Sequence, residues 1–203
     1  MPVPNKIAML SFFRKNEAHA NAVAIYRVIA SQARNGFFYT DLGVPDTVEG
    51  RYEMLTAHMY PVLRHLKNHD GASRDFAQTL FDVFFKNMDD SLRELGVGDM
   101  SIGRKIRAMA ESFYGRVGAY EKGIESDDDG VLIDAVGRNI FNDPVHPKAA
   151  LFADYLRVSI DHLDEIPIDQ LLGGQVSFPD PKSSPKPGSK NNEPATTDEK
   201  VRS

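Results

Sequence analysis

Apolar residues recur along most of the chain at the three- and four-residue spacing of an α-helix. In 18–33 the apolar and alanine side chains fall on one face, and Gly36 follows as a stop signal. Similar spacing predicts further helices over 47–68, 76–95, 101–120, 130–141 and 149–163, and a short one over 168–172. No stretch alternates apolar and polar residues as a strand does. The pattern therefore predicts an all-α fold, a single-domain helical bundle of about six helices.

The helix predicted over 76–95 is apolar over more than half of its circumference. Only a narrow polar strip remains for water, and its charges are spaced for pairing one turn apart: Asp82, Lys86, Asp89 and Arg93. A helix of this kind must be packed on two sides. We therefore predict that it lies at the centre of the bundle, with neighbours on both flanks.

Two other segments depart from regular helical spacing. Pro61 lies inside the helix predicted over 47–68, where it removes a backbone donor, so we expect a kink or a break. After Gly173 and Gly174, and fully from Pro179 onward, proline, serine, lysine and asparagine replace apolar residues, and nothing offsets the entropy lost on ordering. We therefore assign 1–175 to one helical domain and 176–203 to a disordered C-terminal tail.

The composition limits which kinds of partner and which cellular compartment we expect for this protein. The 203 residues carry a net charge of -5, which argues against a specific nucleic-acid partner, and the absence of cysteine excludes disulfides and thiolate chemistry. No apolar run reaches the roughly 18 residues of a membrane span, and the start lacks a signal or transit sequence. Residues 7–13 are apolar and precede Arg14 and Lys15. They are either a first turn packed on the body, which we favour, or a weak interfacial anchor. We expect a cytoplasmic protein, or one peripheral on the inner face of the cytoplasmic membrane.

Candidate chemistry is weak throughout the sequence. The glycines of 98–105 resemble a phosphate-binding loop, but Arg104 stands where lysine is required and Ile106 cannot ligate magnesium. His58, His65 and His69 share a helix face, yet the first two are about 10 Å apart, too far for one ion. No GxSxG nucleophile elbow is present. We therefore predict no enzymatic activity, no cofactor, no metal and no small-molecule substrate.

The helix predicted over 101–120 carries a more informative pattern. Residues 101–118 hold four basic side chains and one acid, so they form either a patch for an acidic or phosphate-bearing partner or a solvated face. In the solvated alternative, Arg104 and Arg107 lie close enough to Glu111 to pair. Gly115 and Gly118 each cost this helix about 1 kcal/mol relative to alanine. Something should therefore approach its backbone, either a neighbouring helix or a client or partner protein.

Four blocks occur in a recognisable order. They are FYTDLGVPDTVEGRYEM over 38–54, FDV over 81–83, MDDSLRELGVGDMSIG over 88–103 and MAESFYGR over 109–116. Together they resemble the signature blocks of the ubiquinol-cytochrome c chaperone family in alphaproteobacterial form. The match covers residues 15–160.

The resemblance implies a non-enzymatic assembly factor for the bc1 complex. Mitochondrial members are understood to work with a small partner subunit near the ribosomal exit and to hold newly made cytochrome b. It implies as partners newly made cytochrome b or another bc1 assembly component, with contact to the ribosome or the inner membrane. The alternative function is that of a generic helical adaptor between two proteins. By resemblance, the expected client or partner site comprises Arg93, Gly96, Gly98, Asp99, Gly103, Lys105, Phe113, Tyr114, Gly115 and Arg116.

Overall fold

A computed structural model describes the backbone of residues 6–183 and the side chains of residues 15–183. Within that range the chain forms eight helices and no strand, so the predicted all-α fold is confirmed. The helices are α1 (Lys6–Ala33), α2 (Gly36–Thr40), α3 (Val48–Lys67), α4 (Ala72–Glu94), α5 (Asp99–Glu125), α6 (Asp129–Ile140), α7 (Ala149–Asp164) and α8 (Ile168–Leu172). All the predicted helices are present, whereas the short helix α2 was not anticipated.

Helix α3 occupies the centre of the bundle. Thr47 starts it by accepting a hydrogen bond from the Gly50 amide, and α3 then packs against α1, α4, α5, α6 and α7. The prediction that the helix over 76–95 is the central one is therefore wrong. Helix α4 packs against α1, α3 and α5, but Phe81 and Phe85 remain partly exposed on it.

Pro61 does not end α3, which runs unbroken from Val48 to Lys67. Of the two expected outcomes, a kink or a break, the break therefore does not occur. A proline inside a helix costs about 3 kcal/mol, but Pro61 is buried and the residues on both sides of it pack into the core. Burial on every side of α3 supplies enough free energy to hold the helix through the proline.

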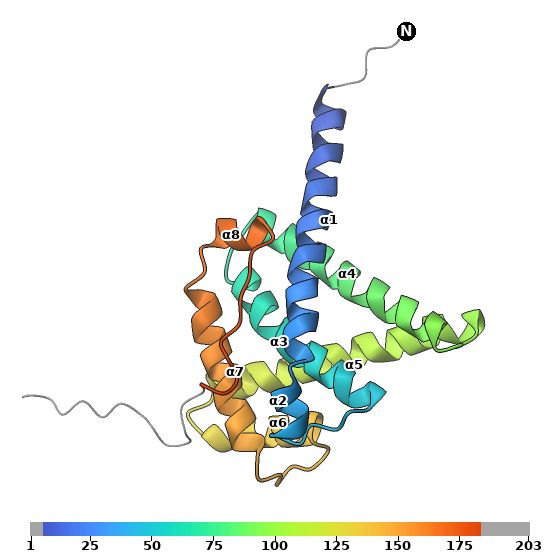
Figure 1. Ribbon diagram of the computed structural model, residues 1–203. Coiled ribbons are helices and arrows are strands. Elements are labelled where there is room, and N and C mark those ends of the chain that lie inside the picture. The colour runs from blue at the N-terminus through green and yellow to red at the C-terminus, as the bar shows by residue number, and fades with distance from the viewer. Residues whose placement is uncertain (1–5, 184–203) are drawn as a thin grey trace, which may run out of the picture.

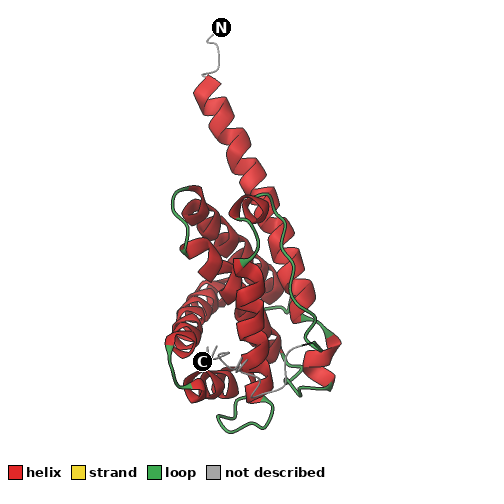
Figure 2. Cartoon of the chain, turned by 90° about the vertical axis from the view of Figure 1, so that its left-hand side faces the viewer, coloured by secondary structure: helices red, strands yellow, loops and turns green. Residues whose placement is uncertain are grey.

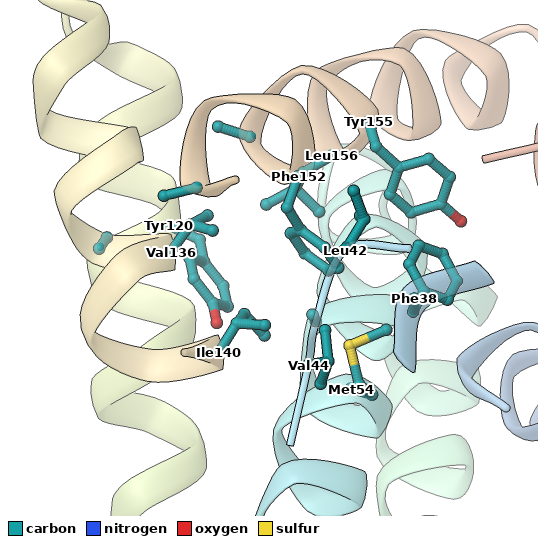
Figure 3. Packing of buried hydrophobic residues seen from close by; sticks show 14 of the residues in the cluster. Phe38, Leu42, Val44, Met54, Tyr120, Val136, Ile140, Phe152, Tyr155 and Leu156 are labelled. Carbon is teal, nitrogen blue, oxygen red and sulfur yellow. The ribbon is translucent and has the colours of Figure 1, made fainter. Parts of the chain in front are cut away.

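Two groups of buried side chains form the core, and α3 contributes to both. In the first, the rings of Phe38, Phe152 and Tyr155 pack beside Met54, as Figure 3 shows. The second lies among α1, α3, α4 and α5, and its largest members include Phe84. Because α3 has apolar side chains on opposite sides, it joins the two groups into one continuous interior.

The hairpin of α4 and α5 reaches outward from this interior. In Figure 1 the two helices converge on a turn at the right-hand edge, and α1 stands upright in the middle of the view. Figures 1 and 2 both show the N-terminal half of α1 projecting beyond the other helices. The two interpretations of 7–13 concern side chains outside the described residues, although the backbone there is part of α1.

The chain after α8 crosses back over the body. Phe178 packs edge-on against His58 with ring centroids 5.4 Å apart, and the Gln32 side-chain amide donates to the Pro179 carbonyl at 3.1 Å. Residues 176–183 thus lie against the helices, whereas the predicted tail begins at 176. Val176 and Phe178 supply the apolar contact that holds them there. The rest of the predicted tail, 184–203, lies outside the described residues.

Candidate functional site

The turn between α4 and α5 is built by a left-handed glycine. Gly96 has φ +79°, a conformation that side chains with a Cβ rarely adopt, and the Val97 amide donates to the Leu92 carbonyl at 3.0 Å. Arg93 joins the two helix ends, because its guanidinium donates to Asp89 at 2.7 Å and to Asp99 across the turn. Gly96 thus ends α4, and Arg93 and Asp99 have a structural role in the turn.

Helix α5 begins earlier than the sequence indicated. Gly98 rather than Ser101 is the N-cap, and its φ of −64° is open to any residue. The backbone at this position therefore does not require glycine. Among the described residues, nothing lies within 4 Å of the position a Cβ on Gly98 would take. Asp99 occupies the first helical position, where a carboxylate is favoured by the exposed amides.

Two of the expected site residues serve the core. Phe113 is 1% exposed and packs against the rings of Phe81, Phe84 and Phe85. Arg116 donates to the Glu53 carboxylate at 2.5 Å and also to Ser112. Burial raises the pKa of the Glu53 carboxyl, and the guanidinium of Arg116 opposes that rise. The Arg116 side chain therefore neutralises a buried acid.

Tyr114, by contrast, lies at the surface of α5. It is 61% exposed, and its ring stacks on Phe81 of α4 with centroids 5.5 Å apart. Phe85 continues the same row, with its centroid 4.5 Å from that of Phe81. Three aromatic rings are thus partly open to solvent along the α4–α5 seam.

Gly118 of α5 extends this surface. Within the described part of the chain, nothing approaches within 4 Å of a Cβ built on Gly103, Gly115 or Gly118. The neighbouring helix that sequence analysis offered as an explanation for Gly115 and Gly118 is therefore absent from this part of the chain. Gly118 instead lines a groove of about 270 Å³ between α3 and α5, whose apolar walls include Leu63, Tyr114 and Val117.

We call Leu63, Phe81, Phe85, Tyr114 and Gly118 the open face. The edge of the open face near α3 is polar, and the Glu121 carboxylate lies at the centre of this edge. Tyr60 donates to the Glu121 carboxylate at 2.6 Å, while Arg64 and Lys67 lie 3.5 and 3.9 Å from the same group. These contacts fix α3 against α5 and leave an apolar depression with a charged edge.

The basic patch on α5 is present and exposed. Arg104, Lys105 and Arg107 have no acidic partner within 4.0 Å among residues 15–183, so the expected pairs with Glu111 do not form. Lys105 projects on the Arg116 side of the helix, opposite Tyr114, because the residues of a helix are spaced 100° apart. The expected site residues therefore divide among the turn, the core, the basic patch and the open face.

The sequence singled out Gly118 but did not indicate that Leu63, Phe81 and Phe85 lie at the surface near it. The spacing of apolar residues is compatible with a core position for all three side chains. For Phe81 and Phe85, the unusual width of the apolar surface on α4 indicated that part of this surface remains uncovered. The helices that pack against α4, which include α1, α3 and α5, do not cover an apolar surface of that width. The uncovered part of α4 then lies beside Tyr114.

The histidines of α3 have structural partners. His58 lies between the Met54 carbonyl and the Tyr155 hydroxyl, and His65 between Asp164 and the Ile166 carbonyl. Burial lowers the pKa of His58 to about 4, against the pull of its hydrogen bond to Met54. Over the described residues there is no group of three or more His, Cys, Asp or Glu able to hold a metal ion. Likewise, no helix in that range is long and apolar enough to cross a bilayer.

The fold and this surface define an all-helical bundle with partly exposed aromatic rings and an exposed mid-helix glycine. The sequence places it in a particular group. Residues 40–178 match the family described as ubiquinol-cytochrome C chaperone, and the chain belongs to that family. This confirms the resemblance carried by the four sequence blocks.

Similar proteins include vertebrate assembly factors. The chain is 25% identical over 160 residues to ubiquinol-cytochrome-c reductase complex assembly factor 1 of Xenopus laevis, covering 76% of this chain and 78% of that protein. It is 27% identical over 146 residues to the Homo sapiens factor, covering 70% of this chain but only 48% of the human protein. The crystal structure of the Cbp3 homolog from Brucella abortus superposes with a TM-score of 0.78 at 37% identity, covering 88% of this chain and 99% of that one.

Proposed function

We propose that this protein is a non-enzymatic assembly chaperone for cytochrome b in the biogenesis of the ubiquinol-cytochrome c reductase, the bc1 complex. The family and the names of the vertebrate relatives support the assembly role. The proposal places the protein in the cytoplasm, or peripherally on the inner face of the cytoplasmic membrane. It binds its client through the open face, to which the region 93–116 predicted from the sequence contributes Tyr114.

One observation carries the choice of surface. Tyr114 is 61% exposed beside Gly118, and a Cβ built on Gly118 would meet nothing within 4 Å among the described residues. Both features are unfavourable for the isolated protein, since an exposed ring gains no burial and a mid-helix glycine costs about 1 kcal/mol. A bound apolar segment would bury the rings and approach the glycine backbone closely.

The chemistry of the open face suits a segment of a nascent membrane protein. Its centre is aromatic and aliphatic, so it can shield an apolar helix from water, and the charged residues around Glu121 lie only at the edge. Flat apolar surfaces with a polar rim are typical of protein contacts. A small polar substrate would find few hydrogen-bonding groups there.

A capture experiment tests this assignment. Cytochrome b is synthesised in a cell-free system in the presence of the tagged full-length protein, and the cytochrome b recovered on the tag is quantified. Gly118→Leu fills the groove without breaking the helix, so we expect recovery to fall at least tenfold. Lys122→Leu places the same side chain on an exposed position of α5 outside the groove, and should leave recovery unchanged.

Charge reversal at Arg116 is a poor test of the same site. It would place a second carboxylate beside buried Glu53 and would change folding as well as binding. If Gly118→Leu and Lys122→Leu capture cytochrome b equally well, the open face is not the client site. If the wild-type protein captures none and a deletion strain keeps its normal bc1 spectrum, the chaperone function itself is wrong.

The alternative function is a generic helical adaptor between two proteins. It predicts a stable stoichiometric complex and a normal level of bc1 in the deletion strain. An enzyme would instead show turnover or a bound metal, and elemental analysis of the purified protein checks the latter.

A further inference from the structure

A second groove lies on a different side of the bundle, between α1, the start of α3 and the end of α4. Its volume is about 940 Å³, and none of its lining residues is shared with the groove at Gly118. Its floor is apolar and includes Tyr26, Ala30, Tyr52 and Met88, each of which is almost fully buried. The groove is therefore a structural feature separate from the open face.

The rim of this groove exposes two large apolar side chains. Val48 at the start of α3 is 59% exposed, and Leu95 at the end of α4 is 63% exposed. They are two of the five large apolar side chains that are exposed among the described residues. A molecule that filled the groove would cover both of them.

The charge of the groove is positive in a protein whose net charge is -5. Arg27, Arg34 and Arg51 line it, and Glu94 is the one acid beside them in the described structure. Arg51 is paired with Asp46, but Arg27 and Arg34 are exposed and have no acidic partner within 4.0 Å among residues 15–183. Two free cations thus flank an apolar floor.

The spacing of Arg27 and Arg34 indicates what kind of molecule would fit the groove. Arg27 lies on α1 and Arg34 directly follows its last residue, Ala33. They are seven residues apart, which is about 10 Å along the axis of a helix, and both line the groove. Val23 and Ala30, also seven residues apart, form an apolar strip beside them. Helices that pair side by side present this combination of an apolar seam and a charged edge.

We propose that this groove binds one helix of a partner protein, whose apolar strip is flanked by carboxylates seven residues apart. The apolar strip covers the floor, Val48 and Leu95, while the carboxylates pair with Arg27 and Arg34. Complementary charge fixes the register of the pair and excludes a basic helix. The inference goes beyond the proposed function, because it concerns a different surface and does not depend on the identity of the client.

Site-specific crosslinking in the cells that encode the protein tests this inference. A photo-reactive amino acid replaces Ser31, which is exposed and lines the groove, in the full-length chain. We expect an adduct whose crosslinked peptide lies in a helix with two carboxylates seven residues apart. Arg27→Glu with Arg34→Glu should lower the adduct yield at least tenfold, and replacing the two partner carboxylates by lysine should restore it to within threefold.

Lys122→Glu with Lys148→Glu is the matched control, since it makes the same change in charge at exposed positions outside the groove. The control should leave the adduct yield unchanged. An adduct with lipid, with a second copy of this chain, or with a segment lacking the carboxylate pair overturns the inference. So does the absence of any adduct, or a yield that is insensitive to the arginine reversal. Capture of cytochrome b by the same variants is measured in parallel, so failure at the groove is distinguished from failure at the open face.

Discussion

At the scale of single residues, His58 shows how burial selects one protonation state. A carbonyl can only accept, so Nδ1–H donates to Met54 at 2.7 Å, and Nε2 accepts from the Tyr155 hydroxyl at 3.0 Å. Tyr155 in turn accepts from the Gln32 amide at 2.9 Å. Every polar atom of this chain of hydrogen bonds is satisfied only while His58 is neutral.

The pH dependence of stability follows from this arrangement. The pKa of His58 is about 4 in the folded protein, below the ordinary value of 6.5, so the unfolded state binds a proton more readily between these values. The stabilising contribution is complete above pH 6.5 and is lost as the pH falls toward 4. We expect the free energy of unfolding to drop by about 2 kcal/mol between pH 6.5 and 5 because of this group.

Urea unfolding at several pH values measures this effect. His58→Gln should be less stable at pH 7 but should lose less stability on acidification than the wild type. His162→Gln, at a partly exposed position bonded to Ser177, should keep the wild-type slope. An identical slope in His58→Gln and the wild type would contradict the assignment.

The ion pair of Arg116 and Glu53 is a second feature of single residues. Removing the guanidinium leaves a carboxylate that is 7% exposed without its partner. We expect Arg116→Met to lower the free energy of unfolding by about 3 kcal/mol. The double variant with Glu53→Gln should regain most of that loss, and a double-mutant cycle by urea unfolding gives the coupling energy. A coupling energy near zero would mean that the pair has no structural role.

At the scale of elements, α5 carries more glycine than its own stability favours. Gly115 and Gly118 have ordinary helical backbone angles, and a Cβ at either position meets no described atom within 4 Å. Nothing in the described structure therefore requires glycine at these two positions. Their presence is consistent with a surface that must remain accessible to another molecule.

Gly115→Ala and Gly118→Ala should each raise the free energy of unfolding by about 1 kcal/mol. The expected increase comes from the lower entropy of the unfolded chain and the better helix propensity of alanine. Thermal unfolding followed by circular dichroism measures it. Gly96→Ala should do the opposite, since φ is +79° at that position. A loss of stability in the two α5 variants would show that the glycines are needed by the fold.

At the scale of the whole molecule, the segment after α8 holds distant parts together. Residues 173–183 reach α1 through Gln32 and Pro179, α3 through His58 and Phe178, and α7 through His162 and Ser177. The Leu172 carbonyl also accepts from the Asn21 amide at 2.9 Å. The segment therefore covers the buried hydrogen bonds of His58.

Phe178→Ala should lower the free energy of unfolding by about 2 kcal/mol, less than for a fully buried ring because Phe178 is partly exposed. Amide hydrogen exchange should also become faster in the stretch of α3 around His58. Val145→Ala, a change at a surface residue that is 85% exposed, provides the control. Unchanged exchange around His58 would show that the segment does not protect it.

Much of this protein is determined by local sequence. The spacing of apolar residues predicts the six long helices and α8, Thr47 and Gly96 mark where helices begin and end, and the four blocks identify the family. These features depend on residues that are close together in the chain, so no knowledge of packing is needed to recognise them. Helix α2 escaped prediction because a five-residue helix has too few turns to show a period.

Tertiary structure decided which of these surfaces are covered. The spacing of apolar residues is the same on a helix face that packs against another helix and on one that meets water. The sequence therefore predicted α4 at the centre of the bundle, whereas Phe81 and Phe85 on α4 remain partly exposed. Likewise, Arg116 and Arg27 are both basic residues on amphipathic helices, yet one neutralises buried Glu53 and the other lines a groove without an acid within 4.0 Å in residues 15–183. Pairing and burial depend on residues far apart in the chain, and only the arrangement of the helices brings those residues together.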